Sequence, residues 1–225
     1  MIGCTRNVVR RVVLVVALVV VAVGGAAREA DVETHDFTIL ISNKPSGEVH
    51  MTIQRQDDAS IVMRCDTDIK VKFGLISYKY VFRGREVWKD RRLVQLDSST
   101  DDNGKRFTVS AVPDGTNLKL TVNNAERQVR GDVWVTSYWT LPGAKQRAEA
   151  LTVLDADNGK LIDAKLGFVA TEKLRIAGQD VTLNHYRLTG KTNIELWYDG
   201  SERLVRQEWT EQGHKTVLEL LRVRR

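Results

Sequence analysis

Cysteine and proline are scarce in this sequence of 225 residues, which contains 2 cysteines and 3 prolines. Cys4 lies in the N-terminal segment, ahead of a long apolar run, so Cys65 stands alone in the remainder of the chain. A single cysteine excludes an internal disulfide. The strand pattern around Cys65 predicts a small buried side chain rather than a reactive thiol. The scarcity of proline excludes a stiff proline-rich linker between domains.

Sequence motifs of common catalytic sites are missing as well. The chain contains no Gly-x-Ser-x-Gly, no Ser-x-x-Lys and no His-Glu-x-x-His, and its 4 histidines lack the spacing of metal ligands. Asp155–Gly159 begins like a calcium-binding loop, but Lys160 and Leu166 stand where such a loop needs glycine and glutamate. We predict a β-turn there, and neither a metal nor a cofactor in the chain.

Charge of one sign is not concentrated in any stretch. The sequence has 34 Lys and Arg against 29 Asp and Glu, a formal net charge of +5. Arg6, Arg10 and Arg11 belong to a segment that we expect to be removed, which reduces this excess further. The remaining charges of both signs are interleaved, so no basic stripe is available for a phosphate backbone. We predict no nucleic-acid partner.

The N-terminus carries the pattern of an export signal. Arg10 and Arg11 precede the apolar run Val12–Val23, and the small residues Gly24–Ala27 follow it. The run is shorter than the roughly 20 residues that a spanning helix needs. We predict a secretory signal over residues 1–27, cleaved near Ala27, and no stable membrane span afterwards. An uncleaved anchor is the alternative, and the paired arginines also fit a twin-arginine signal.

Alternation with a period of two dominates the rest of the chain. It is clearest in Ser60–Phe73, where Ile61, Met63 and Cys65 begin an apolar row and the residues between them are mostly polar. Such a pattern predicts a strand with one buried face. A strand of this length must coil, because sheets twist. We therefore predict an all-β fold over residues 35–225. It would be a single domain of many antiparallel strands in meander order, in a strongly curved half-barrel or open barrel, after a flexible segment at 28–34.

Turn-forming residues separate the expected strands. We place turns at Asn43–Gly47, Lys89–Arg91 and Asp101–Gly104, and a bulge or bend at Arg83–Arg85. Only Gln146–Leu151 is expected to form a short helical turn. The strands expected in the later part of the chain are Ala150–Leu154, Leu161–Leu166, Val169–Ile176, Val181–Leu188, Ile194–Tyr198, Leu204–Thr210 and Lys215–Val223.

Two stretches of the chain repeat each other loosely, Glu86–Ala111 and Glu195–Leu220. Both read Glu-x-Trp-x-Asp, then Arg-Leu-Val, then an acid, a glycine-containing turn and a final apolar segment. Each copy predicts a three-stranded meander. Trp88 and Trp197 occupy matched positions in the two copies.

The aromatic residues are the candidate site residues. We predict that Tyr78, Tyr80, Trp88, Trp139 and Trp197 line a cavity for a hydrophobic ligand, because curved sheets of this size often enclose apolar ligands. The alternative is ordinary core and strand-pair packing, which aromatic residues favour in sheets.

One stretch, Tyr78–Ala111, carries a resemblance to a known family. Its signature is an aromatic strand, Glu-x-Trp-x-Asp, Arg-Leu-Val, an acid and the motif Thr100–Arg106; Tyr138-Trp139, Leu154–Gly159 and Leu196–Asp199 fit later motifs. The chain resembles domain of unknown function 6134, an uncharacterised family of exported bacterial proteins. The resemblance implies location in the periplasm or cell envelope and a fold similar to the curved half-barrels of lipoprotein carriers. It implies no activity, cofactor or catalytic residue.

Four functional hypotheses follow. The first is a non-enzymatic protein of the cell envelope that binds a hydrophobic ligand, such as a lipid or acyl chain, inside the curved sheet. The second is a structural or protein-interaction module with a filled core. The third is an enzyme whose site is assembled across strands from Asp97, Glu208 or His185. The fourth, an outer-membrane barrel, is disfavoured by the many short charged strands.

Overall fold

The computed structural model describes residues 31–73, 76–191, 193–211 and 213–225, so the predicted signal at 1–27 lies outside the described residues. Within these ranges, no helix is long and apolar enough to cross a membrane. The elements are β1 (Val32–Ile41), β2 (Lys44–Arg55), β3 (Ile61–Phe73), β4 (Ile76–Lys89), β5 (Arg92–Asp102), β6 (Lys105–Asp114), β7 (Asn117–Val122), β8 (Ala125–Arg130), β9 (Trp134–Val135), α1 (Ala144–Arg147), β10 (Leu151–Leu154), β11 (Leu161–Ile176), β12 (Gln179–Gly190), β13 (Ile194–Tyr198), β14 (Leu204–Glu211) and β15 (His214–Arg224).

All of these strands belong to one sheet of 15 strands, with β8 at one edge and β9 at the other. The order consists of two meanders, β1 to β8 and β10 to β15, which are joined where β1 pairs with β15. Every neighbouring pair is antiparallel except β9 and β10, which are parallel. The sheet is open, because its two edge strands do not pair. The predicted all-β fold with antiparallel strands in meander order is confirmed.

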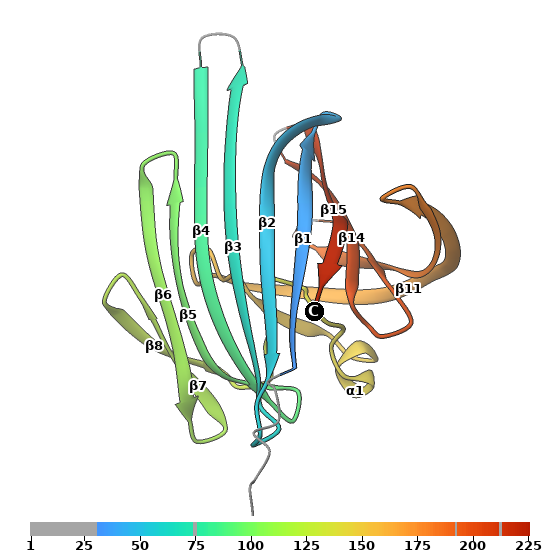
Figure 1. The fold of residues 1–225 in the computed structure, drawn as a ribbon. Coiled ribbons are helices and arrows are strands. Elements are labelled where there is room, and N and C mark those ends of the chain that lie inside the picture. The colour runs from blue at the N-terminus through green and yellow to red at the C-terminus, as the bar shows by residue number, and fades with distance from the viewer. Residues whose placement is uncertain (1–30, 74–75, 192, 212) are drawn as a thin grey trace, which may run out of the picture.

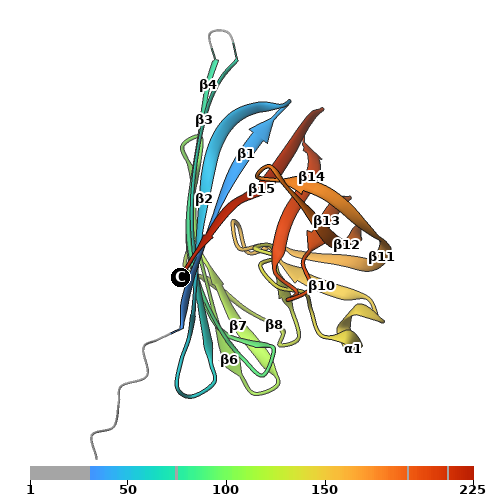
Figure 2. The ribbon, with the colours of Figure 1, turned by 45° about the vertical axis from the view of Figure 1, so that its right-hand side comes forward.

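The sheet is strongly curved. The long strands of the first meander lie side by side, and β3 and β4 extend beyond their neighbours (Figure 1). Seen from the side, β1 to β8 form one wall, and β10 to β14 curl round to face it (Figure 2). Between β8 and β10 the chain passes from one wall to the other through residues 131–150, here called the crossover segment, which contains β9 and α1.

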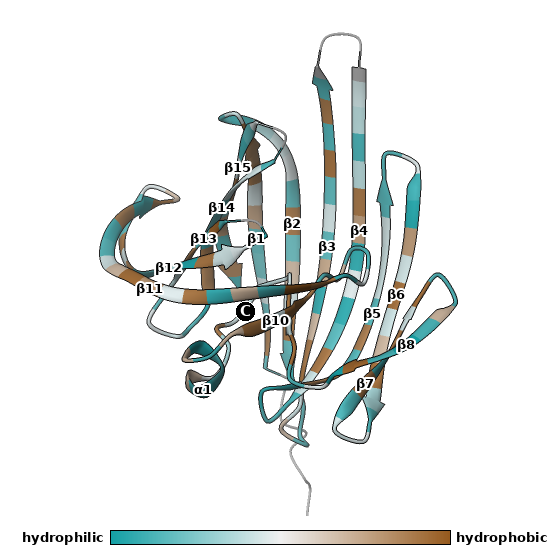
Figure 3. Ribbon diagram, turned by 180° about the vertical axis from the view of Figure 1, so that it is seen from behind, coloured by the Kyte–Doolittle hydropathy of each residue, from teal (hydrophilic) through white to brown (hydrophobic). Residues whose placement is uncertain are grey.

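The crossover segment fills the space between the walls. Val133, Trp134 and Val135 are buried in the main core together with residues of both meanders, and the β10 residues Val153 and Leu154 are fully buried. Figure 3 shows the apolar character of β10 and the alternation of apolar and polar residues along the long strands. The interior of the curved sheet is therefore packed with side chains of the chain itself.

The strand predicted over Ser60–Phe73 is present as β3, and Cys65 lies on its buried face with 5% of its surface exposed. Both predictions are thus confirmed.

The predicted turn at Asn43–Gly47 is displaced. The turn is formed by Ser42 and Asn43, which have positive φ angles of 50° and 63°. Pro45 belongs to β2, beside an irregularity of the β1–β2 register where a strand tolerates the loss of an N–H group.

The predicted bulge or bend at Arg83–Arg85 is wrong, because the pairing of β4 with β3 and β5 is regular there. The bulge lies instead between Val87 and Trp88, in the pairing with β5. Gly84 has a different role: a Cβ atom at this position would lie 2.7 Å from the ring of Phe82. Glycine is needed here because an aromatic ring covers the backbone.

Two predictions in the second half need correction. A single strand, β11, spans the two predicted strands Leu161–Leu166 and Val169–Ile176. Its register shifts between Phe168 and Ala170, because a bulge continues a strand rather than ending it. The expected helical turn at Gln146–Leu151 begins earlier, as α1. Gly143 caps it, and the side-chain oxygen of Gln146 accepts a 3.1 Å hydrogen bond from the Gly143 N–H. Pairing with β11 makes Leu151 the start of β10.

Candidate functional site

A cleft of about 410 Å³ opens at the end of the sheet where the β2–β3 and β4–β5 turns lie. One side is formed by the ends of β1 to β4 and the other by the crossover segment. Its apolar surface consists of Ile53, Ile61, Trp88, Val133, Trp134, Trp139 and Leu141, and its charged residues are Glu33, Arg55, Asp90, Arg91, Glu202, Arg203 and Arg225. The cleft thus combines an aromatic surface with charges of both signs.

Three tryptophans form the aromatic surface. Trp88 is placed at the end of β4 by the bulge that precedes it. Trp134 lies on β9, where its indole N–H donates a 3.1 Å hydrogen bond to the carbonyl of Thr140 and its ring meets Tyr138 edge to face at 4.7 Å. Trp139 comes from the loop that follows. Two separate parts of the chain are therefore needed to build this surface.

A buried glutamate lies behind the tryptophans. Glu86 is 2% exposed, and Trp88 donates a 2.7 Å hydrogen bond from Nε1 to its Oε2 atom. Its partners across the sheet are the apolar side chains of Met63 and Leu96. Burial raises the pKa of Glu86 to about 7, although its polar neighbours act in the opposite direction. Glu86 can therefore change its charge near neutral pH.

His35 is the buried imidazole of the cleft, at 2% exposed, and its Nε2 atom lies 3.1 Å from Oε2 of Glu33. Burial lowers the pKa of His35, and Arg203 acts in the same direction. The imidazole is therefore neutral at pH 7. A buried ring of this kind extends the weakly polar surface of the cleft.

The arginines at the rim are held by acids. Arg225 binds Glu33 at 2.7 Å and Arg91 binds Glu202 at 3.0 Å. Arg55 is held more loosely, since its Nε atom lies 3.6 Å from Asp31 and both side chains are largely exposed. A loosely paired guanidinium at the rim can exchange its partner at little cost.

A second carboxylate with a raised pKa belongs to the turn Asp155–Gly159, which packs against the first meander. Asp157 accepts a 2.7 Å hydrogen bond from the Tyr80 hydroxyl, and Ser98 donates a 2.6 Å hydrogen bond to the carbonyl of Ala156. Burial raises the pKa of Asp157 to about 7, and the charge of Asp155 adds to this effect. The turn predicted here is confirmed.

Within the described ranges, no group of three or more His, Cys, Asp or Glu side chains could hold a metal ion.

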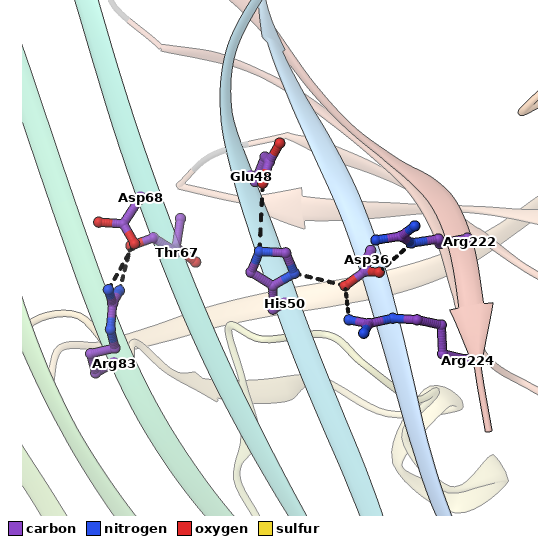
Figure 4. A network of polar contacts seen from close by, with 8 residues as sticks. All are labelled: Asp36, Glu48, His50, Thr67, Asp68, Arg83, Arg222 and Arg224. Atoms are coloured by element: carbon purple, nitrogen blue, oxygen red, sulfur yellow. Dashed lines mark hydrogen bonds and ion pairs between the residues drawn. The ribbon is translucent and has the colours of Figure 1, made fainter.

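The convex face carries a polar network at the junction of the two meanders (Figure 4). Asp36 on β1 accepts hydrogen bonds from His50 on β2 at 2.7 Å, and from Arg222 and Arg224 on β15 at 2.6 Å and 2.9 Å. These partners hold the pKa of Asp36 well below its ordinary value, even though burial acts against them. The network links three adjacent strands, which indicates a structural role.

The structure brings two of the five predicted site residues into one cleft, since Trp88 and Trp139 both line it. Tyr80 packs against the main core and binds Asp157, and the Tyr78 hydroxyl donates a 2.8 Å hydrogen bond to Asp102. Trp197 belongs to a second, smaller cluster with Ile176, Leu183 and Val205. Their role in ligand binding stays a prediction.

The two repeats form the predicted meanders, but their tryptophans face opposite sides of the sheet. Trp88 pairs with Leu93, whereas Tyr198, not Trp197, pairs with the matching Leu204. The cause lies in the turns, because Arg91 alone separates Asp90 from Arg92, whereas Gly200–Glu202 separate Asp199 from Arg203. The longer second turn moves the bulge past Trp197.

Trp197 is held on the far side by polar contacts. Its ring stacks on His185 with 4.3 Å between ring centroids and 11° between planes, and its Nε1 donates a 2.6 Å hydrogen bond to Glu172. His185 also lies 2.7 Å from Glu195, measured from its Nε2 atom. This arrangement satisfies the polar groups of Trp197 and His185 within the protein.

The predicted acids do not converge. Asp97 is on β5 and Glu208 on β14, strands that five others separate in the order of the sheet. Glu208 is bound by Arg206 at 2.5 Å and by Lys215 at 2.6 Å, and these contacts lower its pKa against the effect of burial. A carboxylate held by two cations is a poor general base. This geometry gives no support to an enzyme built from Asp97, Glu208 and His185.

Sequence reasoning missed three residues of the cleft and its surroundings: Glu86, His35 and Trp134. A signal existed for Glu86, which stands two residues before Trp88 and so shares its face of the strand. The apolar partners that bury this carboxylate come from other strands, and the sequence does not show them. Trp134 follows a stretch without clear periodicity, so its strand was not predicted.

An open, curved antiparallel sheet with a chain segment packed across its interior defines a β-barrel-like class of protein. The chain belongs to the family described as Domain of unknown function (DUF6134), whose sequence model matches residues 37–221. A crystal structure described as a beta-barrel-like protein of domain of unknown function DUF1849, from Brucella abortus, is similar in fold. The TM-score is 0.62 at 6% sequence identity, over 85% of this chain and 96% of that chain. No curated protein matches the chain in sequence.

Proposed function

We propose that this protein binds a small amphipathic molecule, such as a fatty acid or another single acyl chain, in the tryptophan cleft. The observation that carries the proposal is the cleft itself, which is about 410 Å³ in volume and lined by Trp88, Trp134 and Trp139. Ligand sites commonly occupy 300–1,000 Å³ and combine apolar walls with a few polar groups. A cleft of this size accepts one chain rather than a whole multi-chain lipid.

The placement of the ligand differs from a central cavity. Because the crossover segment fills the interior, the acyl part of the ligand would lie against Trp139 and Ile61 at the end of the sheet. Its anionic group would replace Asp31 as the partner of Arg55, whose present ion pair spans 3.6 Å in solvent. Exposed ion pairs contribute little to stability, so this exchange costs little.

The binding would take place in the periplasm or cell envelope of a bacterium. This part of the proposal rests on the signal pattern of residues 1–27, in which Arg10 and Arg11 precede the apolar run Val12–Val23. A carrier or sensor of acyl chains in that compartment needs no catalytic residues.

The test is quenching of tryptophan fluorescence by dibromostearate, whose bromine atoms quench an indole on contact. The expected result is saturable quenching in the unaltered protein and its loss in Ile61→Trp, a variant that fills the cleft. Trp197→Phe is the matched control, because Trp197 belongs to the separate cluster and its removal leaves the cleft intact. Equal quenching in the unaltered protein and in Ile61→Trp would overturn the proposal.

An interaction module is the second candidate. It is favoured by Phe168 and Val169 on β11, which are 59% and 45% exposed although both are large apolar residues. Exposed apolar side chains of this kind mark contact surfaces when they occur together. A photo-crosslinking residue at position 168 should then give one discrete product in cells, and the same residue at the exposed Lys173 should not. Identical product patterns at both positions would count against this candidate.

A further inference from the structure

Glu86 connects the cleft to a buried group of hydrogen-bond donors. Trp88 donates to its carboxylate at 2.7 Å. Ser137 Oγ and Trp139 Nε1 are also buried, form no hydrogen bond with any described residue, and lie close enough to Glu86 to lower its pKa. Three donors from two parts of the chain thus surround one carboxylate, and two of them belong to tryptophans that line the cleft.

The protonation state of Glu86 determines how these donors are satisfied. An ionised carboxylate offers two oxygens and can accept hydrogen bonds from all three donors. A neutral carboxylic acid carries an O–H group that itself needs an acceptor, and of the three neighbours only the Ser137 hydroxyl can accept, because an indole N–H only donates. Two indoles must then share one carbonyl oxygen. A carbonyl oxygen can accept two such bonds, but Trp88 holds a 2.7 Å hydrogen bond whereas Trp139 Nε1 forms none in the structure. Trp139 is therefore the indole whose interaction with the neutral acid is weakened.

We propose that Glu86 is a positioning residue of the cleft: ionised, it fixes the indoles of Trp88 and Trp139 for ligand binding, and its protonation releases Trp139 and weakens binding. This inference rests on the proposed function and names the regulation of the same site. Binding of the acyl chain is then stronger at higher pH, where Glu86 is ionised, and its release is easier at lower pH.

The surroundings of Glu86 leave few other groups to produce such an effect. On β3, Cys65 interacts with Glu86, but burial raises the pKa of its thiol to about 12, so it stays neutral. Met63 on β3 and Leu96 on β5 carry no charge. The crossover segment contributes Ser137 and Trp139, whose side chains are neutral.

Two further titratable groups need a control. His35 lines the same cleft, but burial lowers its pKa, which moves its titration further below the midpoint expected for Glu86. Asp157 also interacts with Cys65, and its pKa of about 7 matches that of Glu86. A variant that removes the charge of Asp157 alone is therefore the matched control for Glu86.

The direct test is a pH titration of the indole N–H signals by ¹H–¹⁵N NMR on the ligand-free protein, with Trp→Phe variants for assignment. The signals of Trp88 and Trp139 should move together with a midpoint near pH 7. Glu86→Gln should abolish this movement, and Asp157→Asn should retain it. Signals that do not change with pH, or that titrate unchanged in Glu86→Gln, would overturn the proposal.

A second variant keeps the test decisive if Glu86→Gln does not fold. Trp139→Phe retains an aromatic ring and removes one donor from the carboxylate. The Trp88 signal should then titrate with a higher midpoint, because the ionised form of Glu86 has lost a neighbouring donor that lowers its pKa. An unchanged midpoint would show that Trp139 does not act on Glu86 and would contradict the proposal.

Dibromostearate quenching at two pH values connects the titration to binding. If only the ionised form of Glu86 binds well, the apparent affinity should fall about tenfold from pH 8 to pH 6. Any titration of the fatty acid itself affects the unaltered protein and Glu86→Gln equally. Because Glu86→Gln lacks the titrating carboxylate, its affinity should change much less between the two pH values. Equal changes in both proteins would overturn the coupling. Indole signals that titrate while no quenching occurs at either pH would support the positioning role and overturn the proposed function.

Discussion

Trp88 and Glu86, two residues apart on β4, are joined by a 2.7 Å hydrogen bond between the indole nitrogen and the carboxylate. The matching pair in the second repeat is separated: Trp197 binds Glu172, and Glu195 binds His185. The same local motif therefore gives a buried carboxylate with a pKa of about 7 in one copy and a half-buried, ion-paired carboxylate in the other. The difference follows from the side of the sheet that each tryptophan faces.

Burial of Glu86 makes the stability of the protein depend on pH. Because its pKa is raised from 4.5 to about 7, the folded state binds the proton more tightly than the unfolded state. The stabilisation is fully present below pH 4.5 and is lost as pH rises to about 7, an effect on the order of 3 kcal/mol. Urea unfolding between pH 4.5 and pH 8 should show this fall, and Glu86→Gln should reduce the total fall by that amount, while the contribution of Asp157 remains. Parallel pH profiles for the two proteins would contradict the assignment.

Asp157 contributes to the same pH range through the hydroxyl of Tyr80. Tyr80→Phe removes the 2.7 Å hydrogen bond and should destabilise the protein by about 2 kcal/mol at pH 8, where Asp157 is ionised. The loss should be smaller at pH 5, where Asp157 is protonated and the bond is weaker. Urea unfolding at the two pH values measures both losses. Equal losses would show that the strength of the Tyr80–Asp157 hydrogen bond does not depend on the charge of Asp157.

Asp36 is predicted to stabilise the junction of the two meanders. Asp36→Asn weakens its contacts with Arg222 and Arg224 and should cost about 2 kcal/mol in unfolding free energy at pH 7. The lowered pKa of Asp36 means that this contribution is present above pH 3.8 and is lost as pH falls below it.

Asp68→Asn is the control for Asp36→Asn, because Asp68 binds Arg83 on the same face but is 54% exposed (Figure 4). Its ion pair should contribute less than about 1 kcal/mol. Chemical denaturation of both variants at pH 7 measures the difference. An equally large effect at Asp68 would show that the burial of Asp36 is irrelevant.

Gly159 holds the Asp155–Gly159 turn against the first meander. It has a φ of +72°, and a Cβ atom there would lie 2.3 Å from Cγ2 of Val122. Gly159→Ala should therefore add a steric clash to the backbone strain of about 1 kcal/mol. Gly104→Ala is the control, since Gly104 also has positive φ but no atom lies within 4 Å of its Cβ position. Thermal unfolding should show a clearly larger loss for Gly159→Ala, and similar losses would mean that the turn can move away from Val122.

Much of this fold is predictable because the information is local. The two-residue alternation in Ser60–Phe73 gave β3 and the burial of Cys65, and Asn103 and Gly104 form the predicted hairpin turn with φ angles of 50° and 93°. The open, curved sheet was also predicted. The pairing of β1 with β15 was beyond reach, because it joins the two ends of the described chain and no periodicity encodes it.

The cleft was harder to predict, because contacts between distant segments create it. Trp88, Trp139 and Trp197 were proposed as cavity residues because they are aromatic, and the repeat placed Trp88 and Trp197 at matched positions. Three residues between Asp199 and Arg203 reverse the side that Trp197 faces, and this change of register is not visible in a loose repeat. The crossover segment, which fills the interior, is also the least periodic part of the chain.

Native mass spectrometry of the protein purified from its own source, before and after extraction with organic solvent, tests the central claim most directly. The account predicts one added mass in the range of a single acyl chain, removed by extraction and absent from Ile61→Trp. It also predicts that added stearate restores the mass to the unaltered protein only. A protein whose mass is unchanged by extraction, and which takes up no stearate afterwards, would contradict the claim that the cleft binds an amphipathic ligand.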